Sequence, residues 1–168
     1  MPKAQASKLS TPSPVPAKTP AGERGKGPHE VRDHLRLIAE MTREFTASHN
    51  YKIIVHSCLE RITKYVGAEA ASLFLVADNG EMLACSACYG PVDITGLRIS
   101  ARTGVVGRAV QTREGAMVRD VSADADFGAA VDAKTGFKTR SLLVAPLTIG
   151  QDCLGAIEII NRVGGDVT

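Results

Sequence analysis

The spacing of apolar residues changes at Gly67, and this change restricts the fold more than any other feature of the sequence. Upstream of Gly67, apolar residues recur every three or four positions, which is the period of an amphipathic helix. Downstream of it, short apolar runs are separated by turn residues, which is typical of strands. The sequence therefore predicts a chain that begins with helices and continues into a sheet.

Two consecutive helices are expected before Gly67, over residues 31–48 and 51–66. The second ends where Gly67 can adopt the left-handed conformation that commonly closes a helix. The first carries one apolar stripe, which could pack within its own domain or pair with the same helix of a second copy, and its length does not decide between the two. The members of that stripe are Val31, Leu35, Ile38, Met41 and Phe45.

The remainder of the sequence alternates strand signals with turns. Asp78-Asn79-Gly80 is a strong hairpin signal, and the turn at residues 149–152 joins two buried strands. Strands joined by tight turns favour an antiparallel sheet, and helices grouped in sequence favour an α+β arrangement. The strands are expected at residues 70–77, 82–89, 97–99, 116–118, 142–147 and 153–160.

These elements predict an α+β fold with a central antiparallel sheet of about six strands. Helices 31–48 and 51–66 are expected on one face of the sheet. A ligand pocket is expected on the other face, roofed by a short helix over 103–112 and by the polar segment 120–140.

Residues 1–28 differ in composition from the rest of the chain. They hold six of the eight prolines and only two larger aliphatic residues, Leu9 and Val15. Such a segment cannot bury enough apolar surface to offset the entropy of ordering it, so we expect a disordered tail followed by one domain over 29–168. The tail carries a formal charge of +4, which leaves −2 on the domain, so no nucleic-acid surface is expected there.

No apolar run approaches the roughly 18 residues that span a bilayer, and the N-terminus lacks the apolar core of a secretory signal. We therefore expect a cytoplasmic protein whose cysteines are reduced. Cys85 and Cys88 form a C-x-x-C pair, but they fall in an expected strand, where residues three apart point to opposite faces. A redox enzyme that uses both thiols is a minor alternative, and no metal site is expected.

Polar residues gather directly before one expected buried strand. Residues 131–141 are polar and run into the apolar run 142–147, and a polar loop beside a core can hold donors and acceptors rigidly for a small ligand. Glu158 lies inside the apolar run 154–160, where a charge needs a partner, a ligand or an exit to solvent. No histidine, cysteine or serine forms a recognisable catalytic set, so no catalytic residue is assigned and an enzyme is not expected.

Gly104-Val105-Val106-Gly107 opens the expected short helix. Backbone N–H groups at a helix N-terminus attract anions, but this sequence is neither a P-loop nor a dinucleotide-binding fingerprint. Glycines that let the helix pack tightly against the sheet explain the motif at least as well.

Together these motifs resemble the GAF domain family, the small-molecule-sensing regulatory module of cyclic-nucleotide phosphodiesterases, adenylyl cyclases and sensor kinases. The similarity covers residues 29–163 in order, and it implies the same α+β fold and a non-catalytic sensing function. It rests on residues 71–75, 104–107 with Gln111-Thr112, 120–132, 135–143 and 154–162.

The resemblance to cyclic-nucleotide-binding members implies a candidate ligand, cAMP or cGMP, and no covalent cofactor. It places the purine edge at Ser72, the cyclic phosphate near Val105 and Val106, the sugar and phosphate among three loop residues, and one carboxyl beneath the ligand. The loop residues and the carboxyl are Asp132, Thr135, Thr139 and Glu158.

The sequence departs from those members at the base-stacking position. They place an aromatic ring there followed by Asp, whereas this chain has Ala87 and Cys88. Losing the ring removes on the order of 1–3 kcal/mol of binding free energy. Tyr89 is a candidate to replace it.

The family signature continues past Asn161-Arg162 into a closing helix, whereas the sequence stops at Thr168. The resemblance therefore implies a domain truncated before that helix, with an effector domain in cis or in trans. The favoured hypothesis is a cyclic-nucleotide sensor. The alternative is an interaction module with a vestigial pocket, which forms a homodimer through helix 31–48.

Overall fold

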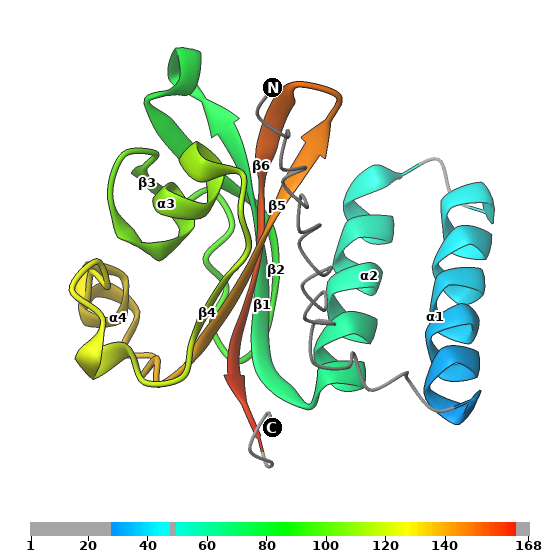
Figure 1. Cartoon of the computed structure of the whole chain (residues 1–168). Helices are drawn as coiled ribbons and strands as arrows, with labels where there is room; N and C mark the ends of the chain where they lie inside the picture. The colour runs from blue at the N-terminus through cyan, green and yellow to red at the C-terminus, as the bar shows by residue number, and fades with distance from the viewer. Residues whose placement is uncertain (1–27, 48–49, 164–168) are drawn as a thin grey trace, which may run out of the picture.

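The computed structural model describes residues 28–47 and 50–163 of the chain. The expectations for residues 1–27 of the tail, for residue 48 of the first helix and for the C-terminal residues 164–168 lie outside the described residues. Pro28, which was expected in the tail, is instead the first residue of the first helix. Two helices lead into a six-stranded sheet in which every pair of neighbours is antiparallel (Figure 1). The α+β fold class expected from the change of period at Gly67 is confirmed.

The sheet has the strand order β3-β2-β1-β6-β5-β4, so the two longest strands lie side by side at its centre. The strands predicted at 82–89 and 116–118 match the observed ones residue for residue, and the others differ by one or two residues at their ends. The bounds are β1 (Ala68–Ala77), β2 (Met82–Tyr89), β3 (Arg98–Ser100), β4 (Ala116–Val118), β5 (Leu142–Ile149) and β6 (Asp152–Arg162).

The second helix, α2 (Tyr51–Val66), covers one face of the sheet along β1 and β2. Its N-terminus is capped by Asn50, whose side-chain oxygen accepts a hydrogen bond from the backbone N–H of Lys52 at 3.1 Å. Its C-terminus closes at Gly67 with φ 69°, the left-handed cap that the sequence predicted. On this face the sheet buries Leu59 of the helix against the strands, together with Ala71, Leu73, Ala87 and Ile159.

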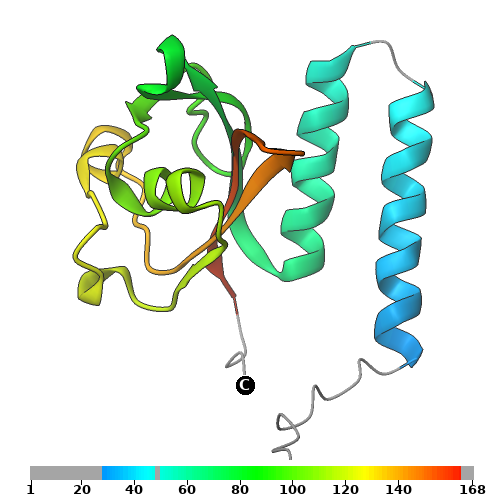
Figure 2. The same cartoon turned by 45° about the horizontal axis from the view of Figure 1, so that its top comes forward.

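The first helix, α1 (Pro28–Ala47), lies on the same side of the sheet but forms an outer layer against α2 (Figures 1 and 2). The ion pair between Glu40 and Arg61, at 3.0 Å, joins the two helices, and the rings of His34 and Tyr65 are 5.4 Å apart. Since α2 already occupies the sheet face, α1 leaves most of its predicted apolar stripe in solvent. The exposed members are Val31, Leu35 and Ile38.

The opposite face of the sheet is covered by α3 (Gly104–Thr112), a 3₁₀ turn at Val121–Ala123 and α4 (Ala130–Thr135) (Figure 2). The segment predicted as a polar loop over 131–141 therefore begins with a short helix, which Gly136 ends at φ 71°. Apolar side chains from the strands and from α3 form the core beneath this cover, among them Phe74, Leu83, Val105, Val144 and Ala156.

A β-bulge in β2 changes which face its residues meet. Ser72 pairs with Cys88 and Leu73 with Ala87, but Phe74 pairs with Cys85, so one extra residue, Ser86, is inserted in β2. Because Ser72 and Phe74 share a face, Cys85 and Cys88 also share it. The expectation that these two cysteines point to opposite faces is therefore wrong, and the inserted residue is the physical reason.

Asn161 on β6 joins the sheet to the segment that precedes β5. Its side-chain oxygen accepts hydrogen bonds from the backbone N–H groups of Arg140 at 2.6 Å and Ser141 at 3.2 Å. Its amide nitrogen donates to the Lys138 carbonyl at 2.8 Å and to the Glu69 carboxylate at 2.7 Å. Asn161 is 1% exposed and adopts φ 55°, so a single buried side chain fixes the path of residues 138–141.

Replacing Asn161 with Ala should destabilise the domain because it leaves several buried backbone groups without partners. Asn79 is a matched control, since it has the same φ of 55° but is exposed in the β1–β2 turn. We expect a loss of about 1 kcal/mol for Asn79→Ala, from the backbone conformation, and about 3 kcal/mol for Asn161→Ala. Chemical denaturation measures both. Equal losses would show that the side-chain hydrogen bonds of Asn161 add nothing.

Candidate functional site

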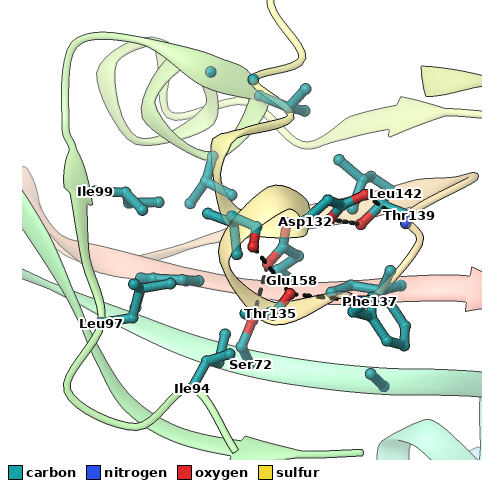
Figure 3. Close-up of a pocket in the computed structure, with 18 of the residues that line it drawn as sticks. Ser72, Ile94, Leu97, Ile99, Asp132, Thr135, Phe137, Thr139, Leu142 and Glu158 are labelled. Atoms are coloured by element: carbon teal, nitrogen blue, oxygen red, sulfur yellow. Dashed lines mark hydrogen bonds between the residues drawn. The ribbon is translucent and has the colours of Figure 1, made fainter. Parts of the chain in front are cut away.

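A cavity of about 340 Å³ lies between the sheet and the segments that cover its second face (Figure 3). Small-molecule sites commonly measure about 300–1,000 Å³. The floor comes from β1 and β6, one wall from β3 and the start of α3, and the opposite wall from α4 and the residues that follow it. Most lining side chains are apolar, with a few polar groups among them, which is the usual composition of a ligand pocket.

All seven residues that the resemblance placed near a ligand line this one cavity. They come from β1, α3, α4, the segment before β5, and β6, and the first and last of them are 86 positions apart in the chain. The structure thus brings together every candidate site residue. They are Ser72, Val105, Val106, Asp132, Thr135, Thr139 and Glu158.

Asp132 and Thr139 are bonded directly to each other across the turn that follows α4. The Asp132 carboxylate accepts one hydrogen bond from the Thr139 backbone N–H and one from its hydroxyl, both at 2.7 Å. Thr135 acts in the same turn, since its hydroxyl donates to the Val131 carbonyl at 2.9 Å and accepts from the Phe137 N–H at 3.2 Å. These side chains therefore shape the wall of the cavity, and each carboxylate oxygen keeps further acceptor capacity.

Glu158 lies in the floor of the cavity, directly across the sheet from Ser72 on one side and Val144 on the other. The Ser72 hydroxyl donates to one oxygen of the Glu158 carboxyl at 2.9 Å (Figure 3). Burial raises the pKa of Glu158 to about 7, and the negative charge of Asp132 adds to the rise, while the Ser72 hydrogen bond opposes it. At neutral pH this carboxyl is therefore divided between its two protonation states.

The start of α3 lines the cavity and is also packed into the core. Val105 and Val106 are 3% and 5% exposed and belong to the core. A Cβ atom at Gly107 would lie 3.1 Å from the Ala101 carbonyl carbon and oxygen, so this glycine allows the helix to pack closely. The packing explanation of the glycine-rich motif is therefore supported.

The cavity also contains residues that sequence reasoning missed. Phe127 and Phe137 line the wall on the α4 side, and Lys134 and Arg98 add positive charge to the lining. The only sequence signal for the two rings is that each is a single aromatic residue in a polar segment. At the expected stacking position, Ala87 faces α2 instead of the cavity.

The other polar clusters have structural partners. Arg108 pairs with Asp124 at 3.3 Å and also with Asp126, so these two carboxylates brace the loop before α4. Over the described ranges 28–47 and 50–163, no three His, Cys, Asp or Glu side chains gather as potential metal ligands. Within those same ranges, no helix has the length and apolar character needed to cross a membrane.

The two cysteines that share the pocket face differ in their surroundings. Burial raises the pKa of the Cys85 thiol to about 12, and the nearby Cys88 adds to the rise. The Cys88 thiol donates to the Asp93 carboxylate at 3.2 Å and accepts from the Ile94 N–H at 3.3 Å. Since the thiolate is the reactive form of cysteine, Cys85 is poorly suited to redox chemistry near neutral pH.

Sequence comparison connects the chain to a domain family and to several phosphodiesterases. The family model described as GAF domain matches residues 51–166. The dual 3′,5′-cyclic-AMP and -GMP phosphodiesterase 11 of Drosophila melanogaster is 22% identical over 158 residues, which is 80% of this chain and 10% of that protein. The probable 3′,5′-cyclic phosphodiesterase pde-5 of Caenorhabditis elegans is 30% identical over 116 residues, 62% of this chain and 16% of that protein. The chain thus spans between a tenth and a sixth of the length of these relatives.

Solved structures share the fold at lower identity. The GAF domain from a phosphoenolpyruvate-protein phosphotransferase of Coxiella burnetii superposes with a TM-score of 0.70 at 19% identity, covering 78% of this chain and 79% of that one. A free methionine-R-sulfoxide reductase from Neisseria meningitidis gives a TM-score of 0.64 at 20% identity, covering 77% and 73%. Similarity at this level supports the fold and says nothing about the ligand.

Replacing Glu158 with Gln should remove a pH dependence of stability. The folded pKa of about 7 lies above the ordinary value of 4.5, so the folded protein holds this proton more tightly than the unfolded chain. The contribution of Glu158 to the free energy of unfolding is fully present below about pH 4.5, and it is lost as the pH rises through about 7. The free energy of unfolding of Glu158→Gln, measured relative to that of the wild type, should therefore be higher at pH 8 than at pH 5 by on the order of 1–3 kcal/mol.

Urea denaturation at the two pH values measures this gain. Glu114→Gln, which makes the same change at an exposed position, is the control and should follow the wild type. If the difference in unfolding free energy between Glu158→Gln and the wild type is the same at pH 5 and pH 8, the pKa of this carboxyl is not raised.

Proposed function

The chain belongs to the GAF domain family, and we propose that its cavity binds a cyclic nucleotide, cAMP or cGMP, as a regulatory signal. GAF domains are regulatory modules that sense small molecules, and the matched relatives named above are cyclic-nucleotide phosphodiesterases. The observation that supports this ligand most is the convergence of polar groups suited to a base, a sugar and a phosphate on one cavity of ligand size.

In the proposed complex, the edge of the base meets Ser72 and Glu158 in the floor of the cavity. The sugar faces the bonded pair of Asp132 and Thr139. The cyclic phosphate meets the N–H groups at the start of α3, where the helix dipole favours a negative charge. Lys134, which lines the same cavity, supplies a positive charge nearby.

Two aromatic residues are available to replace the absent stacking ring. Phe127 and Phe137 both line the cavity on the α4 side, whereas Ala87 is turned toward α2. We propose that one of these two rings stacks on the base, so that the affinity lost at the usual position, on the order of 1–3 kcal/mol, is largely restored from the other wall.

The proposed output is control of an effector in cis or in trans, with no reaction catalysed by this chain. A ligand that contacts Thr139 would act on the segment 138–141. Within this segment Arg140 forms a hydrogen bond with Glu69 at 2.5 Å, and Asn161 of β6 also donates to Glu69. Glu69 lies in β1, two residues after the Gly67 cap of α2, and we propose that this short connection carries the effect of the ligand to the helical face. Because cyclic nucleotides are intracellular signals, the proposal also implies a cytoplasmic location.

Isothermal titration with cAMP and with cGMP tests the proposal. We expect saturable binding, weakened at least about tenfold by Asp132→Ala and by Thr139→Ala. Asp132→Ala removes both hydrogen bonds that shape the wall, and Thr139→Ala removes the one from the hydroxyl. Asp152→Ala, at the exposed first residue of β6, should bind as the wild type does. Absence of both heat and thermal stabilisation with either nucleotide at millimolar concentration would refute the assignment.

The second candidate function is an interaction module, favoured by the exposed stripe on α1. Val31, Leu35 and Ile38 are 45%, 61% and 58% exposed, and their spacing of four and three residues is that of a coiled-coil seam. A seam of this kind is complementary to itself, so we propose that a second copy of the chain covers it in a homodimer. The Phe45 side chain, also predicted in the stripe, lies outside the described residues.

Light scattering at high micromolar concentration tests the dimer. The wild type should be dimeric, and Leu35→Glu should be monomeric because it places a charge in the seam. Arg32→Glu introduces the same residue on an adjacent face of α1 and should leave the dimer intact. A monomeric wild type would remove the support for this module, and a dimer that tolerates Leu35→Glu would exclude α1 as the interface.

A further inference from the structure

The carboxyl of Glu158 has one oxygen bonded to the protein and one left for a ligand. Ser72 donates to Oε2 at 2.9 Å, and among the described residues no hydrogen bond is made to Oε1. In the same part of the chain, no Lys, Arg or His forms an ion pair with this carboxyl. Its two neighbours across the sheet are Ser72 and the apolar Val144, so Oε1 is available to a ligand in the cavity.

Adenine and guanine differ in what they offer to a carboxyl group. The pairing edge of guanine presents two adjacent donors, N1–H and the amino group, which match the two acceptor oxygens of an ionised carboxylate. The pairing edge of adenine presents one donor, the amino group, beside one acceptor, N1. That pattern matches a protonated carboxyl, which has one donor and one acceptor.

We propose that the protonation state of Glu158 selects the nucleotide, with the ionised carboxylate binding cGMP and the protonated carboxyl binding cAMP. This inference rests on the proposed function and on the placement of the base edge beside Ser72, whose hydrogen bond holds the carboxyl in the floor of the cavity. With guanine, the protonated carboxyl would place a donor against a donor. With adenine, the ionised carboxylate would place an acceptor against an acceptor, and each mismatch costs the full desolvation of the unpaired groups.

The selection falls in the physiological range because burial holds the pKa of Glu158 at about 7. Neither nucleotide base nor the cyclic phosphate titrates between pH 6 and 8, so the protein supplies the pH dependence. The other charged or titratable groups near the carboxyl come from β2, β3, α3, α4, the β1–β2 turn and the loop before α4, and two ion pairs hold four of them. They are Cys85, Cys88, Arg98 paired with Asp78, Arg108 paired with Asp126, Asp132 and Lys134.

The size of the effect follows from the fraction of the protein in the competent state. With a pKa of about 7, the ionised fraction of Glu158 rises about tenfold between pH 6 and pH 8, and the protonated fraction falls about tenfold. The dissociation constant for cGMP should therefore fall about tenfold over this range, and that for cAMP should rise about tenfold. The preference between the two nucleotides shifts about a hundredfold toward cGMP.

Titration calorimetry of the full chain with each nucleotide at pH 6, 7 and 8 measures the shift. Glu158→Gln is the decisive variant, because the amide keeps one donor and one acceptor at every pH and so imitates the protonated carboxyl. It should prefer cAMP at both ends of the range, with no pH dependence. Glu114→Gln should keep the wild-type dependence.

A second measurement on the wild type does not depend on any variant folding. At pH 7, in buffers that differ in ionisation enthalpy, cGMP binding should release protons and cAMP binding should take protons up. Binding with a preference that does not change with pH, or without proton exchange, overturns the inference and leaves the proposed function intact. No binding of either nucleotide at any pH overturns both.

Discussion

The fold and the site depend on one buried side chain, Asn161, at the end of the central strand β6. Its amide satisfies two N–H groups and one carbonyl of residues 138–141, a segment with no strand partner of its own. Buried backbone groups must be paired, so this segment would otherwise need solvent. Because Thr139 belongs to the segment and holds Asp132, the wall of the cavity is built on the same constraint.

The two faces of the sheet have separate roles, and the bulge in β2 determines which of its residues lie on each face. It turns Ala87 toward α2 and leaves Cys88 facing the cavity. The cavity face holds a half-ionised carboxyl among apolar walls, which suits recognition of a small polar ligand. The helical face ends in an exposed stripe on α1, which suits contact with a second chain. The hydrogen bonds of Glu69 join the start of β1 to Arg140 and Asn161.

The sequence was sufficient for features that are decided locally. The period change at Gly67, the Asn79-Gly80 turn and the alternation in β2 predicted the elements, and the family resemblance predicted which residues line the cavity. Features decided by distant partners were not predictable. Ser86 carries no signal of a bulge, and nothing in the stripe of α1 indicates that α2 takes the sheet face. The apolar run around Glu158 marked it as a carboxyl that needs a partner, but its hydrogen-bond partner Ser72 lies 86 residues away and could not be read from that run.

The central claim is that the cavity between the sheet and α4 is a cyclic-nucleotide site. Amide chemical-shift mapping by NMR during titration with cGMP or cAMP tests it most directly, because it reports where the ligand lies. We expect saturable shifts at Ser72, Val105, Thr139 and Glu158, with smaller ones reaching Glu69. Shifts confined to α1 and α2, or none at these cavity residues, would contradict it.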